Sequence, residues 1–438
     1  MRPDEMQERL RGSGLFDSVR QAFERRGEPA PPSVHADYVR WKPDSCLVGL
    51  GSGGDFGCDL GYLKIFEEDD ALVCVEKYRA REKGAGWVEH LPEWNAALFR
   101  FPLDRSVAGL GTLADMAALK HVLHGSVHDW SPRSLRVRAR KSTVHMIKYK
   151  PERRGLARVD IALRRQADGQ AARRTVVAQA YAEPTGATVH QVLSHLSAWT
   201  SGGSRFPAAL IPLKVPVPLG YESQRRILIQ EWVEGVEWGE CLGTPLFDQG
   251  CLAAATALRE LRNVPPPPGL ESVFAWDGAS RVLNDLAGMG DPALRRLAGE
   301  LAEGLRSLLA QSAVLAPRLI HGDFHYHQIL LQPESGQGTL IDWDEARLGD
   351  PREDPGNLLA HFHLLELDGR VSPAEGARLR DLFVARLRPQ PDLPVFTALQ
   401  LSRLALVPFR NLRADWRRET MALLTRVGEI LESEGARS

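Results

Sequence analysis

LIHGDFHYHQIL, residues 319–330, is the stretch that decides the fold of this chain. An apolar lead-in ends at a His-Gly-Asp turn, and a polar loop then leads into a second apolar run. A short hairpin brings one more apolar strand to its end at Asp342. This layout places Asp323, Gln328 and Asp342 around one small volume. Phosphoryl transfer with Mg²⁺ needs such a set, because one carboxylate receives a hydroxyl proton while oxygen ligands hold the metal on the phosphates.

Composition and charge restrict the class of protein. The chain has 438 residues, and a prior of ~150 residues per domain predicts two or three domains. An apolar content of 43% with 25% charged residues is typical of a globular protein. Lys and Arg number 55 against 56 Asp and Glu, which leaves a formal charge of -1. This balance predicts neither nucleic-acid nor membrane partners.

The cysteines and the N-terminus indicate a cellular compartment. The five cysteines contain no Cys-x-x-Cys pair, which favours reduced, buried thiols over a zinc ribbon or a disulfide framework. The first residues lack the apolar core of a signal peptide, and no apolar run approaches the ~20 residues of a membrane span. We therefore expect a cytoplasmic protein.

The first half of the chain contains two similar β-rich stretches. Residues 6–26 have the apolar spacing of one or two amphipathic helices. Residues 38–78 then predict several strands, the last of them at 71–75. A related pattern recurs over 145–181, where KYKP at 148–151 matches RWKP at 40–43. We interpret the two stretches as a degenerate internal repeat of a small antiparallel β unit.

A glycine-rich turn inside the first β stretch offers a different interpretation. Residues 49–54, GLGSGG, match the GxGxxG pattern of dinucleotide-binding loops. That pattern requires a helix directly after the turn, since the helix N-terminus binds the phosphates. Two further glycines follow here without a helical period, so the motif by itself is a weak signal.

Beyond the second β stretch the chain becomes mainly helical. The strand over 226–235 ends in an acidic connector that closes with glycine, and apolar residues then recur at helical spacing up to the C-terminus. We divide the chain into residues 1–135, with the N-terminal helices and first β unit, 136–235, with the second β unit, and the helical residues 236–438.

Three segments together resemble the catalytic signature of the aminoglycoside phosphotransferase / choline kinase-like superfamily. They are HGDFHYHQ at 321–328, IDWDEA at 341–346 and GDPRED at 349–354. The resemblance extends over roughly residues 140–438. It implies an α+β, two-lobed protein-kinase-like fold with a small antiparallel β lobe and a mainly helical C-terminal lobe. Residues 1–135 would form an extra, cap-like N-terminal α+β subdomain.

The resemblance also implies an activity and roles for individual residues. A member of this superfamily would be an ATP-dependent, Mg²⁺-dependent kinase of a small-molecule hydroxyl, as a monomer or homodimer. Asp323 would be the catalytic base or hydroxyl-orienting carboxylate, and His321 would brace its loop. Asp342 and Gln328 would bind Mg²⁺ on the nucleotide phosphates. Asp354 would hold the backbone of the catalytic loop.

The chain departs from the superfamily pattern at two positions. Gln328 replaces the usual Asn, as in maltokinase-like members, and it offers the same amide oxygen on a longer stem. Gln179 occupies the position of the phosphate-binding Lys in the small lobe. A neutral amide cannot supply the charge of that Lys. Either Lys148 or Lys150 replaces it from a neighbouring strand, or the activity is weak, or the nucleotide binds differently. The first β stretch carries Lys64 at the matching position.

The superfamily also implies a nucleotide hinge. The resemblance places this hinge at Glu231 to Val233, where backbone groups would meet the adenine. The segment follows an apolar strand and precedes the acidic connector. Residues 136–235 would then form the nucleotide-binding small lobe with its hinge, and residues 236–438 the catalytic and acceptor-binding lobe.

Two other classes of function stay open at this point. Gln179 and Gln328 together are compatible with a pseudokinase that binds a nucleotide or a partner without turnover. His321, His325 and His327 beside Asp323 are compatible with a metal-dependent hydrolase, since alternate histidines can bind a metal. That site would need further ligands at later strand ends, whereas the C-terminal half is helical.

Arginines in the last helices bear slightly on the acceptor. An aminoglycoside is polycationic and would favour an acidic pocket. The arginines therefore favour a neutral or anionic hydroxyl compound such as a sugar, although a solvated helix face accounts for them equally well. They are Arg378, Arg380, Arg386, Arg388, Arg403, Arg410, Arg413, Arg417 and Arg418.

Overall fold

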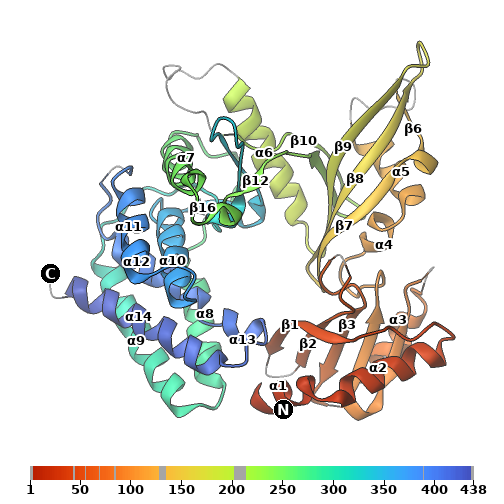
Figure 1. Cartoon of the computed structure of the whole chain (residues 1–438), viewed down its shortest axis with the longest axis horizontal. Helices are drawn as coiled ribbons and strands as arrows, with labels where there is room; N and C mark the ends of the chain where they lie inside the picture. Colours follow the sequence, from red (N-terminus) through yellow and green to blue (C-terminus); the bar gives the residue numbers. More distant parts are fainter. Residues whose placement is uncertain are drawn as a thin grey trace. The chain divides into compact units, whose positions relative to one another are not determined.

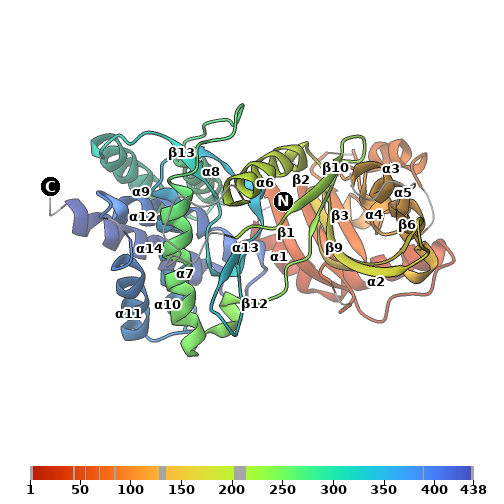
Figure 2. The same cartoon turned by 90° about the horizontal axis from the view of Figure 1, so that it is seen from above.

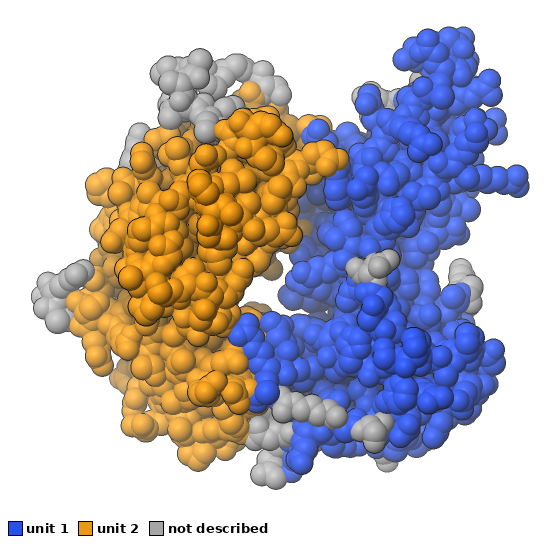
Figure 3. Space-filling view, viewed as in Figure 1, with its two compact units in different colours: residues 1–190, 218–232, 409–414 blue, residues 191–217, 233–408, 415–438 orange. Residues whose placement is uncertain are grey.

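The chain forms two compact units, which Figure 3 colours separately. The computed structural model describes residues 3–42, 45–54, 56–68, 70–82, 85–127, 135–201, 214–387 and 389–435. Unit 1 comprises residues 1–190, 218–232 and 409–414, and unit 2 comprises residues 191–217, 233–408 and 415–438. Among the described residues, no helix combines the length and the apolar character that crossing a membrane demands.

Unit 1 begins with two helices and a five-stranded antiparallel sheet. In α2, Leu15, Val19 and Phe23 recur at helical spacing and are buried, as the sequence predicts. The sheet has the order β1-β2-β3-β5-β4. The elements are α1 (Pro3–Arg11), α2 (Ser13–Arg25), β1 (His35–Lys42), β2 (Ser45–Gly51), β3 (Gly61–Phe66), α3 (Ala71–Arg79), β4 (Val88–Leu91), a 3-10 turn (Pro92–Trp94) and β5 (Ala96–Arg100).

The strand predicted at residues 71–75 is wrong, because this segment begins helix α3. Ala71, Cys74, Val75 and Tyr78 are its buried residues, and they recur at the i, i+3, i+4, i+7 spacing of a helix. The intervening Leu72 and Val73 are exposed. The helical spacing of the buried residues is therefore not apparent from residues 71–75 alone. It becomes apparent only when residues beyond 75 are included.

A second antiparallel sheet follows, with two short helices before it. Its path is β10-β11-β9-β8-β6, and β7 also pairs with β8. Strands β8 and β9 are long and run side by side (Figures 1 and 2). The elements are α4 (Leu110–Leu113), α5 (Met116–Ser126), β6 (Leu135–Val137), a 3-10 turn (Ala139–Lys141), β7 (Thr143–Lys150), β8 (Arg154–Arg165), β9 (Ala171–Tyr181), α6 (Thr185–Ser201), β10 (Pro218–Glu222) and β11 (Ile227–Glu231).

The two sheets of unit 1 share one strand order. The first follows β1-β2-β3-β5-β4, and the second follows β7-β8-β9-β11-β10 with β6 added at its edge. In both sheets a helix connects the third strand to the fourth. This agreement supports the internal repeat predicted from the sequence, although Pro43 of the first motif lies outside the described residues. The described residues between Gly51 and Gly61 contain no helix, so the dinucleotide-loop interpretation is wrong.

One hydrophobic core joins the two sheets of unit 1. It contains Leu47, Tyr62 and Phe99 from the first sheet, and Val159 and Ala178 from the second. Since successive side chains of a strand alternate between faces, the neighbours of the core residues in β7, β8 and β9 lie on the opposite face of the second sheet.

Unit 2 is mainly helical, as predicted. Its helix starts carry typical caps: Asp291 accepts hydrogen bonds from two backbone N–H groups of α9, and Ser372 accepts one at α11. The helices are α7 (Pro245–Leu261), α8 (Ala275–Gly288), α9 (Pro292–Gln311), α10 (Glu353–Leu367), α11 (Pro373–Val384), α12 (Leu393–Leu404) and α14 (Trp416–Gly435). The short helix α13 (Val407–Arg410) begins in unit 2 and ends in unit 1. Helix α10 lies in the interior between α11, α12 and α14 (Figure 1).

Short strands and 3-10 turns of unit 2 carry the His-Gly-Asp segment. Two small sheets form, with orders β12-β14-β15 and β13-β16. The elements are β12 (Val236–Glu237), a 3-10 turn (Trp238–Cys241), β13 (Arg318–Ile320), a 3-10 turn (Tyr326–Gln328), β14 (Ile329–Leu331), β15 (Gly338–Leu340), a 3-10 turn (Trp343–Glu345) and β16 (Arg347–Gly349).

Candidate active site

A buried carboxylate holds the turn after β13. Asp354, in the first turn of α10, accepts hydrogen bonds from the N–H groups of His321 at 2.7 Å and Gly322 at 2.8 Å. Burial raises the pKa of the Asp354 carboxyl, and His321 with the two N–H donors opposes that rise. Gly322 has a φ of +82°, and a Cβ there would stand 2.2 Å from the Glu345 carbonyl oxygen. Only glycine fits this position.

The His321 side chain connects the two segments that carry the acids. Its Nε2 lies 2.8 Å from the carbonyl oxygen of Ile341, directly before Asp342. Since a carbonyl oxygen only accepts, Nε2 carries the proton, and Nδ1 is left to accept the Asp323 N–H at 3.4 Å. The ring is fully buried. His321 therefore fixes the backbone of Asp323 against the chain at Asp342.

Asp323 presents a partly exposed carboxylate between two polar partners. Its Oδ1 lies 3.5 Å from Nδ2 of Asn357, and its Oδ2 lies 3.7 Å from Nε2 of His325. The side chain is 43% exposed. Burial acts to raise the pKa of Asp323, but the hydrogen-bonding contribution of the His325 side chain holds it below its usual value. Asp323 is therefore ionised at neutral pH.

His325 is held so that one ring nitrogen faces Asp323. Its Nδ1 accepts the His327 N–H at 3.2 Å, so the proton of a neutral ring lies on Nε2, towards Asp323. The ring stacks on His361 with centroids 4.1 Å apart. Burial and the adjacent His325 lower the pKa of His361 well below its usual value. The Gln328 amide nitrogen lies 3.3 Å from the same His325 Nε2.

Two residues of this site, Asn357 and His361, are not predicted from the sequence. Both lie on α10 after Asp354, at i+3 and i+7, which places the three residues on one helix face. The sequence singles out His325 only as a possible ligand in the hydrolase alternative. The spacing from Asp354 is the signal that would have found Asn357 and His361, once Asp354 was known to anchor the loop.

Gln328 and Asp342 are held next to each other by the backbone. The Ile341 N–H donates to the Gln328 carbonyl oxygen at 2.9 Å. Asp342 itself has a left-handed backbone, with φ of 59°, which turns the chain sharply after β15. Its side chain is half-buried. An amide oxygen and one carboxylate fit Mg²⁺ that also binds nucleotide phosphates and water, because Mg²⁺ rarely takes an all-protein cage.

The histidines of this segment are engaged by other groups. Both ring nitrogens of His321 have partners, His325 Nδ1 accepts a backbone N–H, and His327 pairs with Glu237. No group of three or more His, Cys, Asp or Glu in the described part of the chain has a metal-binding arrangement. The hydrolase alternative, which requires such a set, has no support in this geometry.

The predicted nucleotide residues lie on the second sheet and just after it. Lys148, Leu156 and Gln179 are successive register partners across β7, β8 and β9. Register partners place their side chains on one face, so Lys148 and Gln179 share the face opposite the core. Lys148 is exposed, and Gln179 is buried.

Lys64 and the hinge residues lie elsewhere in the chain. Lys64 Nζ is buried and lies 3.9 Å from Glu152 Oε2, within unit 1. Burial lowers its pKa, and Glu152 opposes this. Glu231 ends β11, and the chain passes from unit 1 to unit 2 between Trp232 and Val233.

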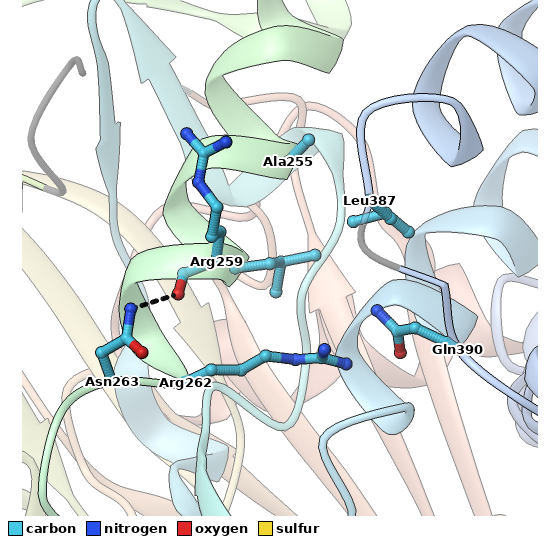
Figure 4. A pocket seen from close by; sticks show the side chains of 7 residues that line it. Ala255, Arg259, Arg262, Asn263, Leu387 and Gln390 are labelled. Carbon is cyan, nitrogen blue, oxygen red and sulfur yellow. Dashed lines mark hydrogen bonds between the residues drawn. The ribbon is translucent and has the colours of Figure 1, made fainter. Parts of the chain in front are cut away.

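A small pocket of unit 2 is separate from these acids (Figure 4). It lies between α7 and the chain at Leu387 and Gln390, and its volume is about 20 Å³, room for roughly one water. The Asn263 side chain donates to the Arg259 carbonyl oxygen at 3.1 Å, and Arg262 crosses the opening. None of its described lining residues carries a carboxylate or belongs to the candidate site.

Most arginines of the last helices have partners within the protein. Arg378 pairs with Asp248, Arg380 with Glu366, and Arg418 with Asp415. Arg417 pairs with Asp291. Arg388 lies outside the described residues. These ion pairs engage four of the nine arginines, so those four give no indication of an anionic acceptor.

The chain resembles known proteins both in sequence and in structure. A sequence model described as the phosphotransferase enzyme family matches residues 173–399, somewhat more than half of the chain. No curated protein gives a significant match. Among solved structures, a choline kinase from Cryptosporidium parvum has 11% identity and a TM-score of 0.48, and the match covers 74% of this chain and 97% of that chain.

Two further solved structures show a similar likeness. A choline/ethanolamine kinase family protein from Mesorhizobium loti has 13% identity and a TM-score of 0.44, covering 72% of this chain and 95% of that one. A thermostable mutant of aminoglycoside phosphotransferase APH(4)-Ia, in ternary complex with AMP-PNP and hygromycin B, has 16% identity and a TM-score of 0.44. That match covers 72% of this chain and 98% of the other.

Proposed function

Because the chain belongs to the phosphotransferase enzyme family, it is a phosphotransferase that acts on an alcohol group, and we propose that it transfers the γ-phosphate of ATP to the hydroxyl of a small molecule. The observation that carries this proposal is the ionised, partly exposed Asp323, fixed by His321, His325 and Asn357. A sugar-like compound or another small neutral metabolite is the proposed acceptor.

Asp323 would orient the acceptor hydroxyl. In the proposed reaction the hydroxyl oxygen forms a bond to the γ-phosphorus, while the bond from that phosphorus to the β–γ bridging oxygen breaks. A carboxylate with a lowered pKa is a weak base. Asp323 would therefore accept a hydrogen bond from the hydroxyl at first, and would take its proton only as the new bond forms and the hydroxyl becomes acidic.

The chain offers ligands for a metal ion on the nucleotide. Asp342 and Gln328 would hold Mg²⁺, and the ion would neutralise negative charge on the phosphates. His321 keeps these ligands in register with Asp323, because its ring bonds the backbone of both segments. The Glu231–Val233 backbone would bind the adenine, at the point where the chain leaves β11.

A nucleotide-binding protein without turnover is the second candidate. Gln179, at the expected Lys position, and Gln328, at the expected Asn position, favour it. The constrained Asp323 favours the enzyme, because binding a nucleotide alone does not require a fixed carboxylate beside the phosphates.

A thermal-shift titration followed by a turnover assay tests the proposal. We expect ATP to raise the Tm only with Mg²⁺ present, by linkage of binding to folding, and we expect ADP formation with one member of a panel of sugars and amino alcohols. Stabilisation without turnover on any acceptor would favour the second candidate. No stabilisation by ATP or GTP would contradict both.

Lys148 and Lys64 can be compared directly. We expect Lys148→Met to raise the KM for ATP by about tenfold, because it removes the exposed cation on the Gln179 face, a loss of roughly 1.4 kcal/mol. Lys64→Met should leave this KM unchanged and lower the Tm, because Glu152 then loses one buried counter-charge. Steady-state kinetics and thermal melts of both variants measure this. An unchanged KM in Lys148→Met would mean that another group binds the phosphates.

A further inference from the structure

A strongly cationic pocket lies on unit 1, and the proposed phosphoryl transfer does not use it. Its volume is about 740 Å³, and residues from α5, β6, the following 3-10 turn and the end of β8 line it. These elements lie together at the β6 edge of the second sheet (Figure 1). Among its described lining residues none is acidic and six are Lys or Arg: Lys120, Arg136, Arg138, Arg140, Lys141 and Arg164.

The strand register concentrates this charge on one face. Arg136 and Arg164 are direct partners across β6 and β8. Arg138 follows at the next same-face position, since its N–H bonds the Ala162 carbonyl oxygen. Arg173 of β9 is the other register partner of Ala162. Like charges placed opposite each other in a sheet are destabilising, so a counter-anion bound here would relieve that repulsion.

The described part of the chain does not compensate the charge of the pocket. None of the six lining cations has an acidic partner among the residues that the structure describes. Two arginines of β8 that lie outside the pocket do have such partners. Arg165 pairs with Asp168 at 3.1 Å, and Arg158 pairs with Asp160 at 3.2 Å. The chain as a whole carries a formal charge of only -1. The uncompensated charge is therefore a local feature of the pocket.

The chemistry of the lining points to phosphate. A guanidinium group binds a phosphate through two parallel hydrogen bonds, and arginine is the preferred residue for such recognition. One phosphate group carries about 1.5 to 2 negative charges at neutral pH, so two or more phosphates match six cations. Its described lining residues include no Phe, Tyr or Trp, which single-stranded nucleic-acid sites use to stack bases.

We propose that the pocket formed by α5, β6 and β8 binds a small molecule that carries two or more phosphate groups. The proposal is independent of the phosphoryl-transfer site, because all lining residues belong to unit 1 and none is a candidate catalytic or metal-binding residue. The bound phosphates would connect β6 to β8 through Arg136 and Arg164, and would thus stabilise the edge of the sheet.

Calorimetric titration of the full chain with tripolyphosphate tests this site. Mg²⁺ is left out, so that metal-dependent binding at Asp342 does not contribute. We expect one bound tripolyphosphate per chain, a raised Tm, and an affinity that falls with salt concentration. The double variant Arg136→Gln/Arg164→Gln should bind at least tenfold more weakly. It should fold, because the substitution removes a like-charge pair.

A matched double variant separates the pocket from general charge. Arg165→Gln/Arg418→Gln also removes two exposed cations, and both of them lie outside the pocket. It should bind tripolyphosphate like the natural chain. The single variant Arg140→Gln, in the 3-10 turn that follows β6, should weaken binding without changing the paired strands.

Three results would overturn the proposal. The first is the absence of tripolyphosphate binding to the natural chain. The second is equal weakening in the two double variants, which would show attraction by net charge alone. The third is tighter binding of a short DNA duplex than of tripolyphosphate at equal phosphate concentration, lost in Arg136→Gln/Arg164→Gln, which would assign the pocket to nucleic acid.

Discussion

Asp323→Asn is expected to lower kcat by roughly 10²–10⁴-fold and to leave the affinity for Mg·ATP unchanged. The amide keeps the shape of the carboxylate and its contact with Asn357, but it can neither take the hydroxyl proton nor hold a negative charge. A phosphoryl acceptor assay gives kcat, and a titration with AMP-PNP gives nucleotide affinity. Because the carboxyl pKa is held low, ionisation of Asp323 should not limit the rate of the natural enzyme between pH 5 and 8.

Two variants make this prediction specific. Asp342→Asn should instead weaken Mg²⁺-dependent nucleotide binding, because it removes the carboxylate that is proposed to hold the metal ion. Asp381→Asn, on the exposed part of α11, should change neither quantity. If Asp323→Asn kept the full rate, the assignment of the hydroxyl-binding carboxylate would be wrong.

Asp354→Asn should destabilise unit 2 and inactivate the enzyme together. The carboxylate accepts the N–H groups of His321 and Gly322 with its two oxygens. An amide has one oxygen and directs its NH₂ group at the other N–H. We expect the free energy of unfolding to fall by about 2–4 kcal/mol, since a buried donor loses its acceptor, and the Tm to fall by roughly 5–10 °C.

The readout for Asp354 separates positioning from catalysis. Thermal melts with Asp381→Asn as the matched carboxylate-to-amide control measure stability. Assays well below the lowered Tm measure kcat, which should still fall, because the Gly322 turn then no longer holds Asp323 in place. A variant with unchanged Tm and unchanged kcat would show that the loop keeps its shape without Asp354.

The predicted α+β, protein-kinase-like fold class is confirmed, as is the likeness to the aminoglycoside phosphotransferase family. Three short segments identify the family: HGD, IDWDE and GDPRED. Each is a run of consecutive residues, so it can be recognised in the sequence without the tertiary structure. Helices such as α9 and α14 were predicted because their apolar period extends over many turns. The division at residues 135 and 235 stays a prediction.

The error at residues 71–75 has a physical reason. A five-residue apolar run fits a buried strand and a helix equally well, because the two periods differ only over longer stretches. Tyr78 completes the helical period. The sequence does not predict helix α8 as a separate helix. Prolines and short polar segments are weak signals for the ends of helices in this region.

The sequence by itself determined the acids, their order and the turn that presents them. Asp323, Asp342 and Asp354 are recognisable because a strand end followed by a glycine turn and polar residues is encoded within a few positions. It also determined the two antiparallel units, whose strands have short-range patterns. These features depend on residues that are close together in the sequence, so the sequence is sufficient to predict them.

Only the tertiary structure decided the environment of the acids. Asn357 and His361 reach the Asp323 loop because α10 packs in the interior of its unit. The pKa of Asp323 is lowered mainly by the ring of His325, against the effect of burial. The same holds for the cationic pocket, where strand register joins residues that are 28 positions apart in the sequence, Arg136 and Arg164. Contacts between residues that are far apart in the sequence depend on how the helices and strands pack, so they cannot be predicted from a short sequence pattern.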